Sequence, residues 1–466
     1  MFGIIDFSNL TTESGSLIPS SVWEGLLWIT YQKQLLFVFA GDQDLETYDM
    51  KTNYRQVVKT RSCIIVKSSM FRWSILLYGI TFLVMLPVLC HNMKHSFYFS
   101  AWKDKKEGIA SLQILDKQRF QLAKEFMKGL NMTSQQWKNH QNTSKPQKPV
   151  VVISIITQSR RRAFRNGYKS YYLTQTAMKF LELIQKMDSG FPLKVFICNV
   201  DIDPHRYSEA LDLGRAMDVA NRFSELTLLS SNAKEKEKQD YMFCLNKSLD
   251  YDGDFIFLVE DDALPLDDAL HVLKHIVEVH VGSKFVSDRA TPRVQRTAFI
   301  KFYHPDRLLQ FTSAGIERIP ELVSLAALLS TVVTAFQSLF LATLHMSVQK
   351  MHHLWSYWFI FFVLVSLCVG RTHLLRLRQF LSPHLYSLTP TPSCCTQAVL
   401  YPRHSARSLL HYMETKTCNN TYAKDHILDE FPGREHMMAY LVQPNVFEHI
   451  GLYSALRGEI VDPLIL

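Results

Sequence analysis

FIFLVEDDALP, residues 255–265, is the stretch from which the organisation of this chain can be inferred. Five mostly apolar residues, 255–259, run directly into three acids at 260–262, and a proline at 265 signals a turn. A short apolar run that is rich in aromatic and β-branched residues indicates a buried strand of an α/β sheet. Open α/β sheets bind ligands in the crevice beyond the carboxyl ends of their strands, which is where these acids fall.

The three acids are Glu260, Asp261 and Asp262, and their carboxylates repel one another unless a cation or a cationic ligand is near. Hard oxygen ligands of this kind suit Mg²⁺ or Mn²⁺ bound together with the phosphates of a substrate. An acidic turn without any ligand explains the bare triplet equally well. The triplet is therefore a candidate metal site that needs support from the rest of the chain.

The composition limits the class of protein. The chain has 466 residues, enough for two or three domains. Hydrophobic residues make up 47% and aromatic residues 12%, with 30 Phe and 19 Tyr, which favours a membrane-associated protein. The net charge of +8 is spread along the chain without one long basic block, so nucleic acid is not an expected partner. No CxxC pair occurs, so neither a zinc site nor a thioredoxin-like motif is indicated.

Residues 1–69 form an N-terminal extension to which the sequence assigns no role, and they lack the pattern of a cleavable signal peptide. Residues 70–92 contain Trp73–Cys90, 18 residues without a charge, which is about the minimum for a membrane span. Lysines and arginines precede this run, so the positive-inside rule favours a cytosolic amino end, although lysines follow as well. We expect an uncleaved transmembrane signal anchor with the rest of the chain in the lumen.

A polar stem is expected at residues 93–148. Helical periodicity runs through residues 109–130, and a stretch rich in Gln, Asn, Ser and Lys follows at 134–148. Glycosylation sequons begin at Asn131, Asn142 and Asn419, and all three are compatible with a lumenal location.

Strands and helices alternate in residues 149–320, the first part of the expected globular domain. Apolar runs predict strands at 150–156, 194–200, 255–259 and 297–303. Helices are expected at 168–187 and 233–249. Such an alternation is typical of a mostly parallel sheet with right-handed crossovers, as in nucleotide-binding α/β domains.

Residues 321–371 interrupt this domain with two more apolar runs. Residues 322–346 contain no Asp, Glu, Lys or Arg and are long enough to span a bilayer with tilt, and residues 354–370 are a second run. Only residues 347–353 separate the two runs. They must therefore form a tight antiparallel hairpin whose outer ends lie on the same side of the membrane.

Three arginines follow the hairpin, and they oppose the positive-inside rule if its outer side is lumenal. They are Arg371, Arg376 and Arg378. Either the topology is inverted, or these side chains contact lipid headgroups or an anionic acceptor. We favour the second interpretation because it keeps both halves of the sheet in one compartment.

Residues 372–466 form the second part of the globular domain. Helices are expected at 405–415 and 424–430, and a final strand at 438–443. Disulfides persist in the lumen, where five cysteines are expected to lie: Cys198, Cys244, Cys394, Cys395 and Cys418. The adjacent pair at 394–395 could form a vicinal disulfide or bond to different partners, and sequence alone leaves the connectivity open.

Three further groups lie apart from the triplet in the sequence and are ordinary when taken singly. Residues 235–240, EKEKQD, have the pattern of a solvated helix face. Asp425 precedes a short helix. His449 lies in a C-terminal loop between apolar residues, where a packed histidine is the usual explanation.

In combination, these groups resemble the GT-A glycosyltransferases, and in particular the Golgi family that adds N-acetylgalactosamine to the GPI anchors of proteins. The resemblance runs from about residue 70 to the C-terminus. The stretches that carry it are PVLCHNMKHSFYF, VVISIIT, VFICNV, EKEKQDYMFCL, FLVEDDALP, KFYHPDRLLQF, LSPHLYSLTPTPSCCTQAVLYP and VQPNVFEHIGLYSALR. A tandem transmembrane hairpin inserted in the transferase domain is a distinctive trait of that family. A more distant likeness is to the N-acetylglucosaminyltransferases that branch N-glycans.

The resemblance implies a GT-A-type domain and a role for each acid. Glu260 would face the nucleotide ribose, and Asp262 would bind Mn²⁺ (or Mg²⁺) across the diphosphate of the donor, UDP-GalNAc. His449, in the family's C-terminal HIG motif, would be a further metal ligand. Asp425 would be the catalytic base that takes the proton of the acceptor hydroxyl.

The remaining donor contacts are implied by the same resemblance. Thr157 and Arg160 would contact uridine or phosphate from the end of the first strand. The other members of the nucleotide-sugar pocket would be Lys236, Lys238, Asp240 and Asp261. The first-strand loop, TQSRRRAF, departs from the family's pattern, which carries an acid directly before the matching arginine.

The implied function is an inverting, metal-dependent transfer of N-acetylgalactosamine from UDP-GalNAc to a mannose of the GPI glycan. The acceptors would be GPI-anchored proteins. The chain would be a multi-pass protein of the Golgi membrane, in contact with its lipids, with a lumenal catalytic domain. Two alternatives are a catalytically inactive escort or regulator of GPI-anchored proteins, and an N-acetylglucosaminyltransferase that acts on N-glycans. Binding alone needs neither a metal site nor a base, which counts against the escort.

Overall fold

The computed structural model describes residues 69–460, apart from 103–104, 130–149, 161–168, 188–190, 226–231, 282–295, 314, 342–347 and 455–458. The chain divides into two compact units, Met1–Leu76 and Leu77–Leu466, and every tertiary contact given below lies within the second unit. Nearly all of the N-terminal extension and the sequons at Asn131 and Asn142 lie outside the described residues.

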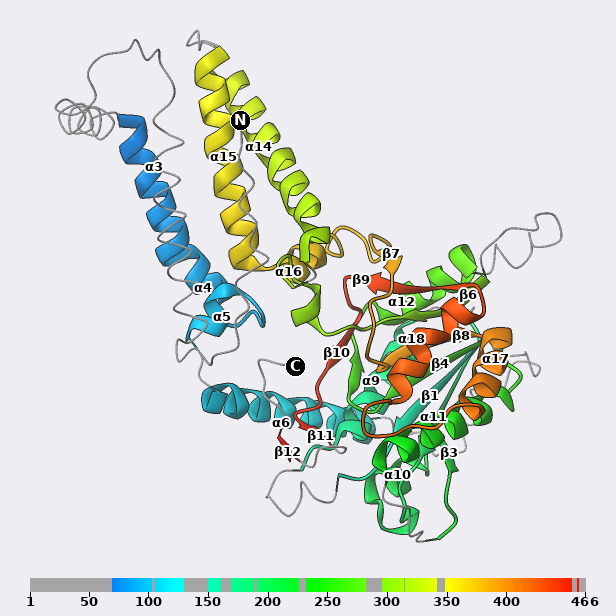
Figure 1. Cartoon of the computed structure of the whole chain (residues 1–466). Helices are drawn as coiled ribbons and strands as arrows, with labels where there is room; N and C mark the ends of the chain where they lie inside the picture. Colours follow the sequence, from blue (N-terminus) through cyan, green and yellow to red (C-terminus); the bar gives the residue numbers. More distant parts are fainter. Residues whose placement is uncertain are drawn as a thin grey trace, which may run out of the picture. The chain divides into compact units, whose positions relative to one another are not determined.

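An eight-stranded sheet forms the centre of the second unit (Figure 1). Its hydrogen-bonded order is β3-β2-β1-β4-β8-β6-β9-β7. In that order the strands are Asp218–Asn221, Leu193–Asn199, Val151–Thr157, Phe255–Glu260, Ala398–Pro402, Arg296–Lys301, Met437–Gln443 and Ser387–Pro390. Each strand expected from the sequence is present within one or two residues of its expected bounds, and the α/β class is confirmed.

The sheet is mixed, and six of its eight strands run in one direction. β3, β2, β1 and β4 are parallel to one another, as the alternation of strands and helices predicts. β8 runs antiparallel between β4 and β6, and β7 runs antiparallel beside β9 at the edge. β6 and β9 are parallel to each other and run in the same direction as β4. The expectation of a mostly parallel sheet therefore holds for six strands and is wrong for β7 and β8. β7 and β8 enter the sheet from the loop region after the apolar helices, so no crossover helix on the sheet sets their direction.

Helices cover both faces of the sheet (Figure 1). One face carries α9 (Tyr172–Lys186), α10 (Ser208–Leu213) and α12 (Ala269–His275). The other carries α11 (Ala233–Leu249), α17 (Arg403–Glu414) and α18 (Lys424–Arg434). Along β1, Val151 and Ile153 enter the first core, whereas Val152 between them enters the second. Burial on both faces explains why the central strands are continuous apolar runs in the sequence.

Two disulfides form among the described residues. Cys198 of β2 bonds to Cys244 of α11, which joins the sheet to a covering helix. Cys394 and Cys395 bond to each other, so the vicinal alternative is the one present. The free thiols within the described part of the chain are Cys90, Cys368 and Cys418.

A long helix, α6 (Lys105–Gly129), occupies much of the region expected to be a polar stem. It packs against α9. Phe120 stacks on Tyr171 with ring centroids 4.2 Å apart, and Gln175 Nε2 donates to Asp116 Oδ1 at 2.8 Å. α6 is thus attached to the globular domain along one side.

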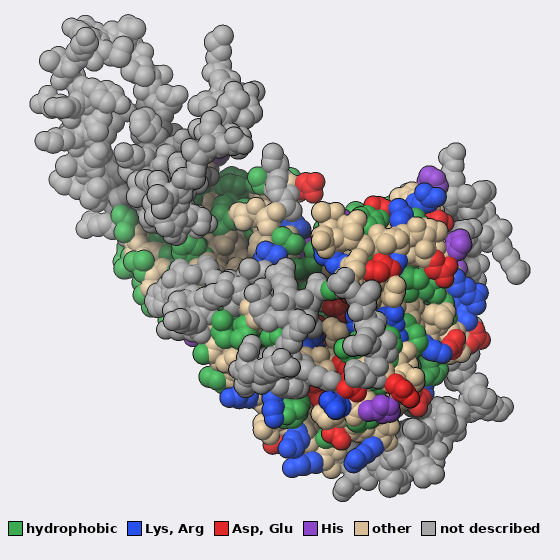
Figure 2. All heavy atoms as spheres, turned by 60° about the horizontal axis from the view of Figure 1, so that its bottom comes forward, with side chains coloured by type: hydrophobic (Ala, Val, Ile, Leu, Met, Phe, Trp, Pro, Cys, Tyr) green, Lys and Arg blue, Asp and Glu red, His purple; other side chains and the backbone are tan. Residues whose placement is uncertain are grey.

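Three of the described helices are long and apolar enough to cross a membrane, over Trp73–Cys90, Ile319–Leu339 and Met351–Val369. They belong to the helical stretch α3 (Ser69–Ile80), η1 (Thr81–Met85) and α4 (Leu86–Cys90), to α14 (Ile319–Leu341) and to α15 (Val348–Val369). Apolar side chains gather over these helices in Figure 2, whereas charged side chains of both signs are interspersed on the rest of that face. Within the described residues, the three apolar runs expected from the sequence are thus helices.

α14 and α15 lie side by side (Figure 1), and Trp358 Nε1 of α15 donates to Gln337 Oε1 of α14 at 2.8 Å. Arg371, which follows α15, donates through Nε to Glu321 Oε2 near the start of α14 at 2.7 Å. This ion pair joins the outer ends of the two helices. Arg371 is buried, so the expectation that it contacts lipid headgroups or an acceptor is wrong for this arginine.

Candidate active site

A short antiparallel pair brings the acidic triplet and the C-terminal histidine together. β5 (Ala263–Pro265) begins directly after the triplet and pairs with β10 (Phe447–His449), with His449 opposite Ala263. Ile450 N donates to Asp262 O at 2.8 Å and extends the pairing. Two motifs that are far apart in the sequence are thereby neighbours at the end of β4.

Asp262 and His449 form the centre of the candidate site. Asp262 Oδ2 lies 3.5 Å from His449 Nε2, and both side chains are largely buried. Asp262 Oδ1 is buried and has no hydrogen-bond partner among the described residues. Because an unsatisfied buried polar atom costs on the order of 1–3 kcal/mol, this oxygen points to a ligand that the site receives.

Gly451 permits the close approach of these two side chains. A Cβ atom at position 451 would lie 2.5 Å from Asp262 Oδ2 and 2.8 Å from His449 Nε2. Both distances are shorter than a van der Waals contact, so any side chain at 451 would displace the carboxylate or the imidazole. The glycine of the HIG motif is therefore a steric requirement of the site.

The charges around Asp262 favour its ionised form. Burial by itself would raise the pKa of Asp262, but the charges and hydrogen bonds of His449 and Arg160 outweigh burial and lower the pKa below its usual value. A carboxylate beside an imidazole is a donor set that fits Mn²⁺, and less selectively Mg²⁺. Asp262 and His449 are the residues of this site that could hold such an ion.

Asp261, the middle acid, holds Arg160. The guanidinium donates to both carboxylate oxygens, from Nη1 to Oδ2 at 2.8 Å and from Nη2 to Oδ1 at 2.7 Å. Thr157 Oγ1 donates to Asp261 Oδ2 at 2.6 Å, and Arg160 Nη2 also reaches Asp262 Oδ2 at 3.0 Å. A bidentate pair of this kind fixes both position and orientation. Arg160 Nε is buried and has no partner among the described residues, which leaves one donor for a ligand.

Glu260, the first acid, is held by two residues that no sequence motif marks. Its Oε1 accepts from Thr396 Oγ1 at 3.0 Å and from Lys424 Nζ at 3.1 Å. Lys424 also forms an ion pair with Glu237 at 2.9 Å. Burial lowers the pKa of Lys424, but Glu237, Glu260 and the adjacent Asp425 outweigh burial and hold it well above its usual value.

Asp425 lies in the first turn of α18, next to Lys424. Its Oδ2 accepts from Cys395 N at 3.4 Å, and its Oδ1 is buried without a partner among the described residues. Like Asp262, it therefore presents one buried carboxylate oxygen that the protein does not use. Lys424 connects this acid to Glu260 and so to the triplet.

The turn that contains the vicinal disulfide touches three acids. Cys394 N donates to Asp429 Oδ2 at 3.0 Å, Cys395 N donates to Asp425, and Thr396 donates to Glu260. Both cysteines have left-handed backbone, with φ of 77° and 73°. The turn thus orients the candidate base and the first acid of the triplet together.

His304 and the two sulfurs of this disulfide have donor atoms within 4.8 Å of one another. A thiolate, rather than a disulfide sulfur, is the form of cysteine that binds metals. Because Cys394 and Cys395 are bonded to each other, this group offers only one imidazole and is a poor metal site.

A family model described as GPI-N-acetylgalactosamine transferase PGAP4 matches residues 151–448, more than half of the chain. The chain belongs to this family. Membership confirms the resemblance seen in the sequence and supports an enzyme that transfers a sugar. The matched range of the PGAP4 family runs across α14 and α15, contains the triplet and Asp425, and ends one residue before His449.

Two of the three expected pocket residues on α11, Lys236 and Asp240, lie near the ends of β1 and β2. Lys236 Nζ is bonded to Asp240, and it lies 3.3 Å from Val200 O at the end of β2 and 3.5 Å from Gln158 Oε1 after β1. Arg222 is bonded to Asp240 as well. This cluster is adjacent to the strand end that carries Thr157.

Lys238 lies elsewhere on α11. Its Nζ is 3.4 Å from Met413 O, bonds to Lys416 O, and forms an ion pair with Glu235 Oε1 at 2.9 Å. The side chain is buried between α11 and the end of α17. The structure thus brings Lys236 and Asp240 to the strand ends but not Lys238.

Glu209 and Tyr207 also border the site, in a segment whose sequence pattern predicts no helix or strand. Tyr207 Oη lies 2.6 Å from Thr157 Oγ1, and Glu209 Oε1 accepts from Thr174 Oγ1 at 2.7 Å. Burial, opposed by the bonds from Thr174, raises the pKa of Glu209 to about 7. No local motif marks these two residues, because their role depends on a short helix that the sequence pattern does not reveal.

The candidate site is tied to the end of the first apolar helix. Lys94, which follows Cys90, forms an ion pair with Glu448 Oε1 at 3.0 Å, and Glu448 is the neighbour of His449 in β10. Lys94 O also lies 2.6 Å from His373 Nε2 of α16 (Arg371–Leu377), the helix that follows α15. The strand that carries the histidine is therefore linked to the ends of the apolar helices.

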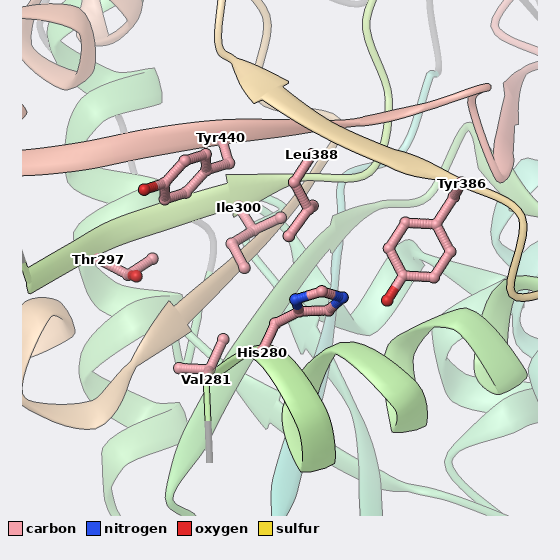
Figure 3. Close-up of a pocket in the computed structure, with 7 residues that line it drawn as sticks. All are labelled: His280, Val281, Thr297, Ile300, Tyr386, Leu388 and Tyr440. Carbon is pink, nitrogen blue, oxygen red and sulfur yellow. The ribbon is translucent and has the colours of Figure 1, made fainter. Parts of the chain in front are cut away.

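A separate cavity of 330 Å³ lies between η3 (Ile276–Val281) and strands β6, β7 and β9 (Figure 3). Figure 3 shows His280 from η3 and Tyr386 near the start of β7 on one side, with Ile300 and Tyr440 from the sheet on the other. None of the expected site residues lines it. This cavity is distinct from the cluster around Asp262.

Proposed function

We propose that this chain transfers N-acetylgalactosamine from UDP-GalNAc to a mannose of the GPI glycan on GPI-anchored proteins, with inversion at the anomeric carbon and with the help of a divalent metal ion. The observation that carries the proposal is the pairing of Asp262 with His449, which leaves Asp262 Oδ1 buried and unsatisfied. Membership in the PGAP4 family supplies the reaction class, the GPI acceptor and the nucleotide-sugar donor.

Asp262 and His449 would hold the metal, for which Mn²⁺ is the first choice and Mg²⁺ the second. When bound, the metal offsets the negative charge that develops on the UDP leaving group. Gly451 keeps the two ligands close to each other, and Arg160 adds positive charge beside them. An arrangement fixed before the reaction needs little reorganisation in the transition state.

The donor nucleotide would lie along the ends of β1, β2 and β4. Glu260 would accept from the ribose, and its position is fixed by Thr396 and Lys424. Thr157 and Arg160, both held by Asp261, would contact uridine or phosphate, with the unused Arg160 Nε as a donor. Lys236 and Asp240 would border the same pocket, whereas Lys238 would fix α11 against the end of α17. Asp261 acts here as the residue that positions Arg160.

Asp425 would be the general base. Its unpartnered Oδ1 can accept the proton of the acceptor hydroxyl as that oxygen attacks the anomeric carbon from the face opposite the leaving group. The bond from Cys395 N holds the other oxygen, so the carboxylate keeps one orientation. Attack from the opposite face is what produces inversion.

The proposed setting is the lumenal side of the Golgi membrane. Residues 70–92 would be the signal anchor, and the hairpin 321–371 would interrupt a GT-A-type domain built from residues 149–320 and 372–466. The link from Lys94 to β10 supports a site close to the ends of the apolar helices. A GPI-anchored acceptor is held at the bilayer surface by its own lipid, so a site at that level would meet it.

Binding of UDP-GalNAc to the purified full-length chain in detergent tests the donor site and the metal together. We expect binding that requires Mn²⁺, is abolished by a chelator, and falls roughly 100-fold in D262A. Equal binding with and without the ion would overturn the metal-dependent proposal. Selective binding of UDP-N-acetylglucosamine instead would identify the N-glycan alternative, and no nucleotide binding at all would favour the inactive escort.

A further inference from the structure

The segment that follows α15, residues 371–385, exposes large apolar side chains outside the apolar helices. Phe380 is 86% exposed, Leu381 83% and Leu377 57%, so the rest of the protein covers little of the first two side chains and less than half of the third. Single exposed apolar residues are common on protein surfaces. Here three exposed apolar residues lie within five consecutive positions of a segment rich in arginine. Such a patch indicates a surface that binds a partner.

This segment is attached firmly to the protein. Arg371 N donates to Gln310 Oε1 at 2.9 Å, and Gln310 Nε2 donates to Thr372 Oγ1 at 3.1 Å. Leu381 N donates to Arg378 O at 3.1 Å and closes the turn that displays the apolar side chains. The exposure of Phe380 and Leu381 is therefore a property of a hydrogen-bonded turn.

The position of the segment, beside the ends of the apolar helices, indicates that a membrane surface covers it. α15 ends at Val369, and one glycine separates it from α16. The ion pair of Arg371 with Glu321 places the start of α14 next to the start of α16. The contact of His373 with Lys94 O places the end of the first apolar helix close to α16 as well. The ends of all three candidate spans thus meet beside residues 371–385, which is where a bilayer surface must lie if the helices cross a membrane.

The charges of the segment match the phosphates of that surface. Arg378 Nε and Nη2 are buried and have no hydrogen-bond partner among the described residues, and the same holds for Gln379 Nε2. Glu321, the acid at the base of the hairpin, is bonded to Arg371. Arg318 uses its Nη1 on the neutral carbonyls of Leu308 and Gln310. Guanidinium and amide donors without an acid to receive them suit a phosphate group.

We propose that residues 371–385 form a membrane-interface element, in which Phe380 and Leu381 enter the boundary between headgroups and acyl chains and Arg378 with Gln379 binds a phospholipid phosphate. Amphipathic segments with a basic side and a Phe/Leu side bind membranes in this way. The element would hold the globular domain against the bilayer in addition to the three helices. This inference does not depend on the glycosyltransferase activity.

A photoreactive side chain tests where Phe380 lies. The full-length chain, with benzoylphenylalanine at position 380, is reconstituted in vesicles of phosphatidylcholine and phosphatidylserine and irradiated. Mass spectrometry of the peptides should show a lipid adduct at 380. The matched control carries the same group at Leu211, which is 51% exposed on α10, and should show none. Absence of a lipid adduct at 380, or equal adducts at both positions, would overturn the proposal.

Native mass spectrometry of the full-length chain tests the phosphate site. The wild type should retain phosphatidylserine, and Arg378→Gln should retain about tenfold less, because a charged hydrogen bond is lost. Arg407→Gln removes an exposed arginine from α17 and should leave retention unchanged. Equal loss in both variants, or displacement of the lipid by millimolar inorganic phosphate alone, would contradict a headgroup site. The second result would assign the site to free phosphate.

Discussion

The candidate site depends on a position that carries no side chain. At Gly451 a Cβ would lie 2.5 Å from Asp262 Oδ2, so G451A should separate Asp262 from His449. Because misplacement of a catalytic group by about 1 Å can cost roughly 100-fold in rate, we expect sugar transfer by membranes that contain G451A to fall by about that factor.

Gly433 provides the matched control for this substitution. It lies in α18, and a Cβ there would meet no heavy atom within 4 Å. G433A should therefore keep wild-type transfer activity. Wild-type activity in G451A would show that the close approach of Asp262 and His449 is not needed.

Glu209 makes stability depend on pH near neutrality. Its pKa is raised to about 7 in the folded chain, so the folded state binds the proton more tightly than the unfolded state. Stability from this group is present below its unfolded pKa, near 4.5, and is lost as the pH rises towards 7.

Glu209→Gln removes this titration. We expect the melting temperature of the variant, relative to the wild type, to rise between pH 5 and pH 8, by an amount equivalent to about 2 kcal/mol. Glu182→Gln on the surface of α9 is the control, because burial there is outweighed by bonds to Lys186 and Lys179 and the pKa of Glu182 is lowered. A pH-independent difference for Glu209→Gln would contradict the raised pKa.

At the scale of residues, local motifs mark the candidate site residues but not the residues that hold them in place. Glu260, Asp262 and His449 belong to short motifs with recognisable chemistry. Thr396 and Lys424 hold Glu260, yet each reaches it only through the tertiary fold. The position of Lys424 directly before Asp425 was the one local signal that could have revealed it.

At the scale of elements, the vicinal turn is the part of the site that most depends on an unusual bond. Its backbone donates to Asp429 and Asp425, and its carbonyl at Cys394 accepts a hydrogen bond from Lys301 Nζ at 2.7 Å. Replacement of Cys394 and Cys395 by serine should loosen this turn and disorient the candidate base.

We therefore expect C394S/C395S to lower kcat by about tenfold or more while UDP-GalNAc binding changes less, because Asp262 and His449, the proposed metal ligands, lie on other elements. The measurement is steady-state transfer by the purified full-length chain. C198S/C244S removes the other disulfide, which joins β2 to α11. This variant should have a lower melting temperature, while its kcat should stay close to the wild-type value. An unchanged kcat in C394S/C395S would exclude the turn from catalysis.

The regular elements were largely predictable because their patterns are local. β1, β2 and β4 are apolar runs buried on both faces, and α11 keeps its expected bounds of Ala233–Leu249. β8 was not predicted, because its five residues follow a Pro- and Cys-rich loop and their sequence does not distinguish a short strand from a buried loop. The pairing of β5 with β10 escaped for a different reason, since two three-residue strands have no periodicity to detect.

At the scale of the whole molecule, the apolar helices are connected to the catalytic domain by specific contacts. The sequence places two apolar helices between β6 and β7, and the structure joins their outer ends through Arg371 and Glu321. The contact of Lys94 with Glu448 then connects the first apolar helix to the strand of His449. This arrangement supports a transferase whose acceptor is held at a membrane surface.

Mass spectrometry of GPI glycans tests this account most directly. Cells that lack the protein should lose the N-acetylhexosamine side branch from their GPI anchors, and re-expression of the wild type should restore it. D262A and D425A should be present at wild-type abundance and location and should not restore the branch. An unchanged side branch in cells without the protein, or full restoration by either variant, would contradict the account.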